Sequence, residues 1–175
     1  SYSTGGVVRW NISLKKNLGL QERDLDMRGA LSLDQVQAKD KKSGRGIEKM
    51  TAGGSFRGKE ARIEKGEGAW DGISLSNLKG DLAWLSNGFS FKNLAFQALG
   101  GTFRANGTWE TRSDNFIRLT LDPNIEAMDL KALVSQKFPN FKDQIEGQLN
   151  FRGKLRGEGA NSAALQENLQ GEAAA

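Results

Sequence analysis

Apolar and polar residues alternate with a period of two along several short stretches of the chain. The clearest stretch has apolar residues at every second position, at Val8, Trp10, Ile12 and Leu14. Successive side chains of a strand point to opposite sides, so this pattern is typical of a β-strand with one buried and one solvated face. It predicts a strand over residues 8–15. Further strands are predicted over residues 25–33, 55–63, 69–75, 81–85, 89–96, 103–109, 117–121 and 145–155.

The alternation changes parity once within the aromatic middle of the chain. Phe89 and Phe91 share one parity. Leu94 and Phe96 share the other. A slip of one residue near Lys92-Asn93 would return all of them to the same face, as a β-bulge does. We therefore expect a bulge at that point.

Glycine, asparagine and charged residues separate the predicted strands. We expect a second bulge around Gly29-Ala30 and a charged loop over residues 39–49. Tight turns are expected at residues 86–88, at Gly100-Gly101 and over residues 111–115.

The strand pattern breaks at Pro123, and the periodicity then becomes helical. A helix is predicted over residues 128–138, with Asp129 as its N-cap and Pro139 at its end. A last short helix is predicted over residues 163–169. The fold class is accordingly all-β, an elongated curved antiparallel sheet or half-barrel with one or two short helices near the C-terminal end.

Cysteine and histidine are both absent from the 175 residues. Their absence excludes disulfides, thiolate nucleophiles, Ser-His-Asp triads and the usual zinc sites. Carboxylate and lysine chemistry and oxygen-only metal sites stay open. We expect no enzyme activity, no catalytic residue, no cofactor and no metal, because no group of residues in the sequence has the spacing of a catalytic, cofactor or metal site.

The charge balance is mildly basic. Lysine and arginine number 25 against 21 acidic residues, giving a net charge of +4. The two signs are interleaved, which is unlike a nucleic-acid-binding arm, so no nucleic-acid partner is expected. The segment from Gly53 to Lys59 has the spacing of a phosphate-binding loop, but Glu60 stands where a hydroxyl should bind magnesium. A glycine-rich strand connection is the simpler interpretation.

The apolar fraction is only 37%, and the mean hydropathy is −0.55. An extended sheet with little interior explains this deficit. The aromatic residues are then either the core of a closed sandwich or the lining of an open apolar trough. Such a trough could hold acyl chains, because each buried methylene contributes about 0.8 kcal/mol.

The order of motifs from Asp71 to Ala173 resembles the C-terminal region of the AsmA family, envelope proteins of Gram-negative bacteria related to TamB. Paired short strands begin the match, at residues 72–82 and 89–94. A glycine-rich segment follows at residues 98–107, with Leu99 where the family often has tyrosine. The helix motif Met128-Asp-Leu-Lys-Ala-Leu133 and the alternating segment 147–171 complete it.

The resemblance implies a protein anchored in the inner membrane whose bulk lies in the periplasm. It also implies curved β-sheets with an apolar groove, phospholipid transport to the outer membrane, and no catalytic residues. We expect residues 1–175 to be one β domain excised from a longer protein, with residues 71–173 as the AsmA-like region. Bacterial membranes would be contacted through the full-length parent.

The expected function is to hold or conduct phospholipid acyl chains along the groove, for outer-membrane assembly and lipid homeostasis. An alternative is a non-enzymatic β scaffold that assists outer-membrane protein assembly through protein contacts. A carbohydrate-binding β domain, with Trp84 or Trp109 exposed, is a third interpretation. The groove candidates are Trp10, Trp84, Phe89, Phe91, Phe96, Phe103, Trp109, Leu119 and Phe151.

Overall fold

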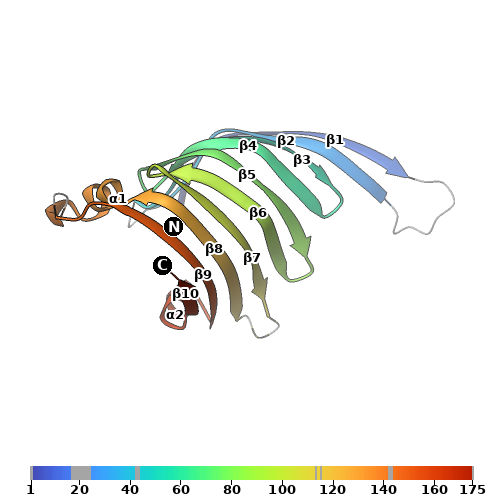
Figure 1. Ribbon diagram of the computed structural model, residues 1–175. Coiled ribbons are helices and arrows are strands. Elements are labelled where there is room, and N and C mark those ends of the chain that lie inside the picture. The colour runs from blue at the N-terminus through green and yellow to red at the C-terminus, as the bar shows by residue number, and fades with distance from the viewer. Residues whose placement is uncertain are drawn as a thin grey trace. The chain divides into compact units, whose positions relative to one another are not determined.

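The described residues of the chain form ten β-strands, two short α-helices and one 3-10 turn (Figure 1). A computed structural model describes residues 2–16, 25–41, 44–112, 114, 116–141 and 144–174. The strands are β1 (Tyr2–Lys16), β2 (Leu25–Asp40), β3 (Gly46–Arg57), β4 (Glu60–Trp70), β5 (Ile73–Leu85), β6 (Gly88–Ala98), β7 (Gly101–Thr111), β8 (Ile117–Asp129), β9 (Gln148–Gly159) and β10 (Gln170–Ala174). The helices are α1 (Leu130–Lys137) and α2 (Ser162–Glu167), and the 3-10 turn is Pro139–Phe141.

The strands occur in the sheet in chain order, from β1 to β10. The prediction of an all-β, curved, open antiparallel sheet with short helices near the C-terminal end is confirmed. The chain forms two compact units, residues 1–83 and residues 84–175. We call them the N-terminal unit and the C-terminal unit.

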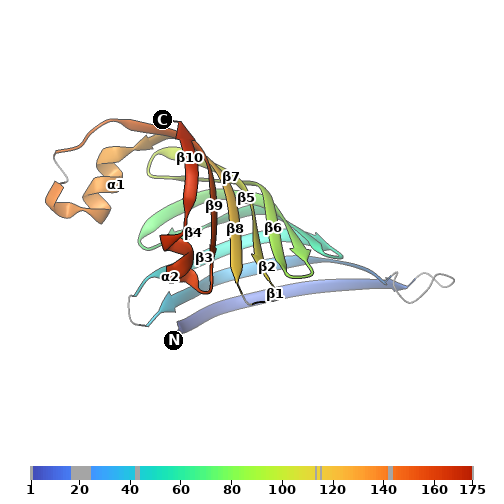
Figure 2. The ribbon, with the colours of Figure 1, turned by 90° about the horizontal axis from the view of Figure 1, so that it is seen from below.

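In the N-terminal unit, cross-strand pairing collects the apolar residues on one face. On β1 and β2, Trp10 pairs with Leu31 and Leu14 pairs with Met27. Residues directly opposite each other in an antiparallel pair point to the same side. Figure 2 shows these strands from below.

The register of the sheet is interrupted by bulges, several of which have a residue at positive φ. Asn93 has φ 52°, and the β6–β7 register shifts between Phe91 and Leu94. The predicted bulge near Lys92-Asn93 is therefore confirmed. The bulge expected around Gly29-Ala30 is wrong, because pairing runs without a break from Leu25 to Leu33. On β2 the irregularity comes later, at Gln35, whose φ is 51°.

Several predicted strand ends were wrong because two-residue turns lie inside the predicted strands. The predicted strand 55–63 is divided by a turn at Gly58-Lys59, and the predicted strand 69–75 by a turn at Asp71-Gly72. The turn expected at Gly100-Gly101 is instead Leu99-Gly100, with φ values of 50° and 74°. Positive φ at both central residues is typical of a type I′ hairpin turn, whose twist matches that of the strands.

The loop expected over residues 39–49 is much shorter. Strand β2 continues to Asp40, and β3 begins at Gly46. The backbone N–H of Asp40 donates to the carbonyl oxygen of Arg45 at 2.8 Å, which closes the connection. The two charged strand ends also face each other through an ion pair of 2.9 Å between Lys39 and Glu48.

The expected break at Pro123 is also wrong, because β8 runs through it to Asp129. Pro123 lies opposite Ala105 of β7, and the β8–β9 register is the same before and after it, at Leu121–Leu155 and Asn124–Arg152. A proline has no N–H to donate, so it removes a ladder bond, but here it does not end the strand.

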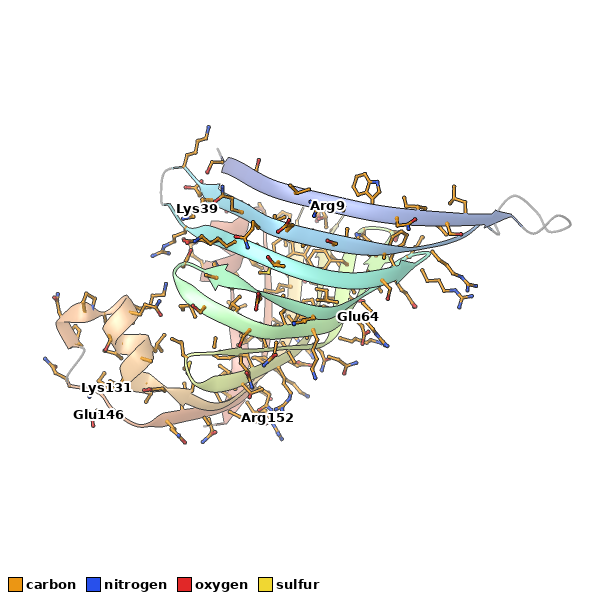
Figure 3. All side chains as sticks on the ribbon, turned by 90° about the horizontal axis from the view of Figure 1, so that it is seen from above. Arg9, Lys39, Glu64, Lys131, Glu146 and Arg152 are labelled. Atoms are coloured by element: carbon orange, nitrogen blue, oxygen red, sulfur yellow. The ribbon has the colours of Figure 1, made fainter. Side chains whose placement is uncertain are left out.

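Helix α1 follows β8 directly. The Asp129 side chain accepts a hydrogen bond from the Ala132 N–H at 3.1 Å, which confirms the predicted N-cap. The helix ends at Lys137, before Pro139, as expected. An exposed ion pair of 2.7 Å joins Lys131 of α1 to Glu146 (Figure 3).

The described residues form very little interior. Among them, the buried apolar residues are Ala98, Met128, Val134 and Leu165, and no large side chain is fully buried. The accessible surface is 12380 Å², whereas a compact monomer of 19.1 kDa exposes about 8,400 Å². The low apolar fraction of the sequence therefore reflects a sheet with most of its surface open.

Candidate functional site

The candidate site is one face of the sheet in the C-terminal unit. Cross-strand pairing places Phe89 opposite Trp109 and Trp109 opposite Leu119, all on this face. Apart from Thr111, which lies opposite Ile117 at the end of β7, every position that pairing assigns to it on β6 to β9 is apolar or glycine. We call this set the apolar face: Phe89, Phe91, Leu94, Phe96, Ala98, Gly101, Phe103, Ala105, Gly107, Trp109, Ile117, Leu119, Leu121, Pro123, Ile125, Met128, Leu149, Phe151, Gly153, Leu155, Gly157 and Gly159.

The opposite face of the same strands is polar and carries ion pairs between neighbouring strands. Arg104 pairs with Glu126 at 2.7 Å, and Arg118 pairs with Glu158 at 2.6 Å. The hydrogen bond from Arg104, followed by one from Asn124, lowers the pKa of Glu126. Exposed pairs of this kind contribute little to stability because water screens them, so this face mainly keeps the sheet in contact with water.

The rings on the apolar face lie flat against one another and against glycines. Phe96 stacks on Phe103 with ring centres 5.0 Å apart and planes within 6°. Phe89 and Trp109 are nearly parallel, with centres 6.4 Å apart. A Cβ added to Gly107 would lie 2.5 Å from the Phe91 ring, so that ring occupies the space above the glycine. The result is an apolar layer one side chain thick.

Helix α2 covers one end of this layer. Leu165, which is only 6% exposed, would contact a Cβ placed on Gly157 at 3.1 Å. The rest of the face is half-buried by its own neighbours: Phe91, Phe103, Leu121 and Phe151 are all partly exposed. In the described part of the C-terminal unit, no second sheet packs on it.

The N-terminal unit has an apolar face of its own. Phe56 lies over Gly29, and Ile63 pairs with Gly54. At its edge strand the side chains are much more exposed, with Trp10 at 70%. Its polar face carries the ion pair between Arg62 and Asp81 at 2.7 Å, which raises the pKa of Arg62.

Most of the groove candidates lie on one surface. The structure places these candidates together on the apolar face of the C-terminal unit: Phe89, Phe91, Phe96, Phe103, Trp109, Leu119 and Phe151. Trp10 lies on the apolar face of the N-terminal unit, and Trp84 lies near the end of β5, 51% exposed.

Sequence reasoning missed several members of the apolar face. Leu94, Leu121 and Leu155 belong to it but are not among the groove candidates, although parity relates Leu94 to Phe96, Leu121 to Leu119 and Leu155 to Phe151. Ile125 was missed because it follows Pro123, where the pattern predicted the end of the strand. Parity also places Gly107 on the face of Phe103 and Trp109, but only the pairing shows that the Phe91 ring lies over it.

Other parts of the described chain offer no competing site. Residues 53–57 lie in β3 and Gly58-Lys59 form its turn, so no phosphate-binding loop exists there. Two surface hollows, of about 600 and 800 Å³, are lined mainly by side chains of the polar face such as Arg152 and Arg118. Within the described ranges, no cluster of acidic residues suits a metal ion, and neither helix is long and apolar enough to cross a membrane.

Comparisons with known proteins add no assignment: no family model, no curated protein and no solved structure matches the chain.

Proposed function

We propose that this chain is a periplasmic segment of an AsmA-like envelope protein and that it binds phospholipid acyl chains on its apolar face. The supporting observation is the unbroken apolar face of β6 to β9 in a sheet that no second layer covers in the described part of the chain. The parent would be anchored in the inner membrane, and the segment would hold or conduct lipid for outer-membrane assembly. No catalytic group or cofactor is needed for this role.

The chemistry of the apolar face favours an acyl chain. Protein partners usually meet a surface that is only about 56–58% apolar and that supplies hydrogen bonds. On this face only the indole of Trp109 and the hydroxyl of Thr111, at the end of β7, can donate a strong hydrogen bond. A chain of methylenes has no hydrogen bonds to lose, so its transfer to the face leaves no polar group unpaired.

The binding energy available is sufficient for a lipid carrier. Burying half of the surface of a chain of about sixteen carbons contributes roughly 6 kcal/mol at 0.8 kcal/mol per methylene. That corresponds to dissociation constants of about 10–100 μM before any other contact is counted. Such binding is tight enough to take up a chain and weak enough to release it.

The test is the lipid content of the purified protein. Organic extracts analysed by mass spectrometry should contain phospholipid or fatty acid in amounts comparable to the protein, and a fluorescent fatty acid should bind with saturation. A protein that carries no lipid and does not bind the fluorescent fatty acid would contradict the proposal.

One observation favours the alternative scaffold role. Strand β1 is the last of the described strands in the sheet order, and its apolar residues are highly exposed, as at Trp10 and Leu14. A strand of this kind can pair with a further strand supplied by a partner. A photo-crosslinker at Asn11 should then capture a peptide copied from an outer-membrane strand. Lipid binding without such capture would dismiss the scaffold.

A further inference from the structure

Helix α2 lies on one end of the apolar face. It packs against β9 at Gly157 and Gly159, whose pairing partners on β8 are Leu119 and Ile117. An ideal Cβ at Gly159 would collide with the backbone of Ala164 and Leu165. The two glycines therefore let the helix backbone approach the sheet more closely than any other residue would allow.

The contacts of α2 are mainly apolar. Leu165 is one of the few buried side chains of the described chain, and Leu169 also reaches the space above Gly157. Aliphatic side chains are thus seated on the surface proposed to hold acyl methylenes, and they make the same kind of contact.

Two side-chain hydrogen bonds also help to position α2. The Asn161 side chain caps it by accepting from the Ala164 N–H at 3.0 Å, and the Asn168 amide donates to the Glu158 carbonyl at 3.2 Å. A six-residue helix has little stability of its own, so its position depends on the contacts with the sheet.

We infer that α2 is a displaceable cover that competes with the acyl chain for the end of the apolar face formed by Ile117, Leu119, Gly157 and Gly159. This inference rests on the proposed function and adds its regulation. A bound chain that reaches this end displaces α2. The apparent affinity for the chain is therefore the intrinsic affinity multiplied by the fraction of molecules in which the end is uncovered.

The glycines provide a matched pair of variants in the full chain. Gly159→Ala should expel α2, because the added methyl collides with the helix backbone. Gly53→Ala is the control, since it makes the same change in β3 where no atom lies within 4 Å. Neither glycine has a positive φ, so neither substitution forces a strained backbone. Leu165→Ser removes the seated side chain and leaves the sheet sequence unchanged; it serves if Gly159→Ala does not fold.

Two measurements decide the matter. In hydrogen exchange, palmitate should reduce the protection of residues 164–168 in the wild type, and in Gly159→Ala that protection should be low before palmitate is added. If α2 is docked about ten times as often as it is open, its release tightens the apparent Kd of a fluorescent fatty acid about tenfold. Gly53→Ala should change neither measurement.

The outcomes separate this inference from the proposed function. Fatty-acid binding with the same Kd in wild type, Gly159→Ala and Leu165→Ser overturns the competition and leaves the proposed function intact. Protection of α2 that rises on addition of palmitate also overturns it. No fatty-acid binding in any of these proteins overturns both.

Discussion

A charge placed on the apolar face should abolish acyl-chain binding, whereas the same charge one residue away should not. Phe91 lies on the apolar face over Gly107, and Ser90 lies on the polar face of the same strand, opposite Thr108. Phe91→Glu removes a ring and introduces a carboxylate that must stay hydrated. Ser90→Glu adds the same carboxylate where water already reaches the sheet.

The expected size of the effect follows from the apolar surface that the Phe91 ring offers to the bound chain. If the ring covers about two methylenes, its removal costs roughly 1.6 kcal/mol at 0.8 kcal/mol per methylene. That energy weakens binding about fifteenfold, since 1.4 kcal/mol is a factor of ten. Dehydrating the new carboxylate weakens it further. Ser90→Glu should stay within about twofold of the wild type because it touches neither ring nor ligand.

Titration of a fluorescent fatty acid gives both values of Kd, and circular dichroism confirms that each variant keeps its strands. Equal weakening in the two variants would show a general effect of charge on the sheet. No weakening in a folded Phe91→Glu protein would refute the assignment of binding to this face.

Three further predictions concern stability. Asn93→Val should lower the free energy of unfolding in urea by about 1–2 kcal/mol, because a β-branched residue is strained at φ 52°, whereas Asn93→Gly should not lower it by this amount. Met128→Ala should lower the free energy of unfolding by about 2–4 kcal/mol, because it creates a cavity at a residue that is only 5% exposed. Trp10→Ala should lower it by less than about 0.5 kcal/mol, because Trp10 is 70% exposed. The hydrogen bond from Arg104 lowers the pKa of Glu126 below its ordinary 4.5. As the pH falls below that value, the wild type should therefore lose stability relative to Glu126→Gln in urea titrations. Between pH 6 and 8 the difference in stability between the two proteins should be constant.

Local patterns predicted the parts of the fold that depend on neighbouring residues. Alternation located the strands, and a change of parity between Phe91 and Leu94 located the bulge at Asn93. The cap at Asp129 was also predictable, because its carboxylate satisfies a backbone N–H three residues later in the chain. In each of these cases the determining residues are close in sequence.

Features that depend on distant residues were not predictable in the same way. Gly29 looked like an irregularity in the strand, but it is regular and holds the ring of Phe56 from the next strand. Pro123 looked like a strand end, but pairing with β7 and β9 keeps the strand in register on both sides of it. The same difference applies to the candidate site: parity identified its aromatic members and Gly107, whereas only the pairing between strands shows which ring lies over that glycine.

The surface shape of the apolar face favours an acyl chain over a rigid protein surface as its occupant. Two packed sheets need side chains from each layer to interdigitate across about 10 Å. Here the rings of Phe91 and Phe151 lie over Gly107 and Gly153, so these parts of the layer have few projecting side chains. A rigid protein surface would interlock poorly with those parts, whereas a flexible acyl chain can follow them at no cost in hydrogen bonds. The docking of Leu165 above Gly157 follows the same rule, because a flexible aliphatic side chain fills a site that a glycine leaves open.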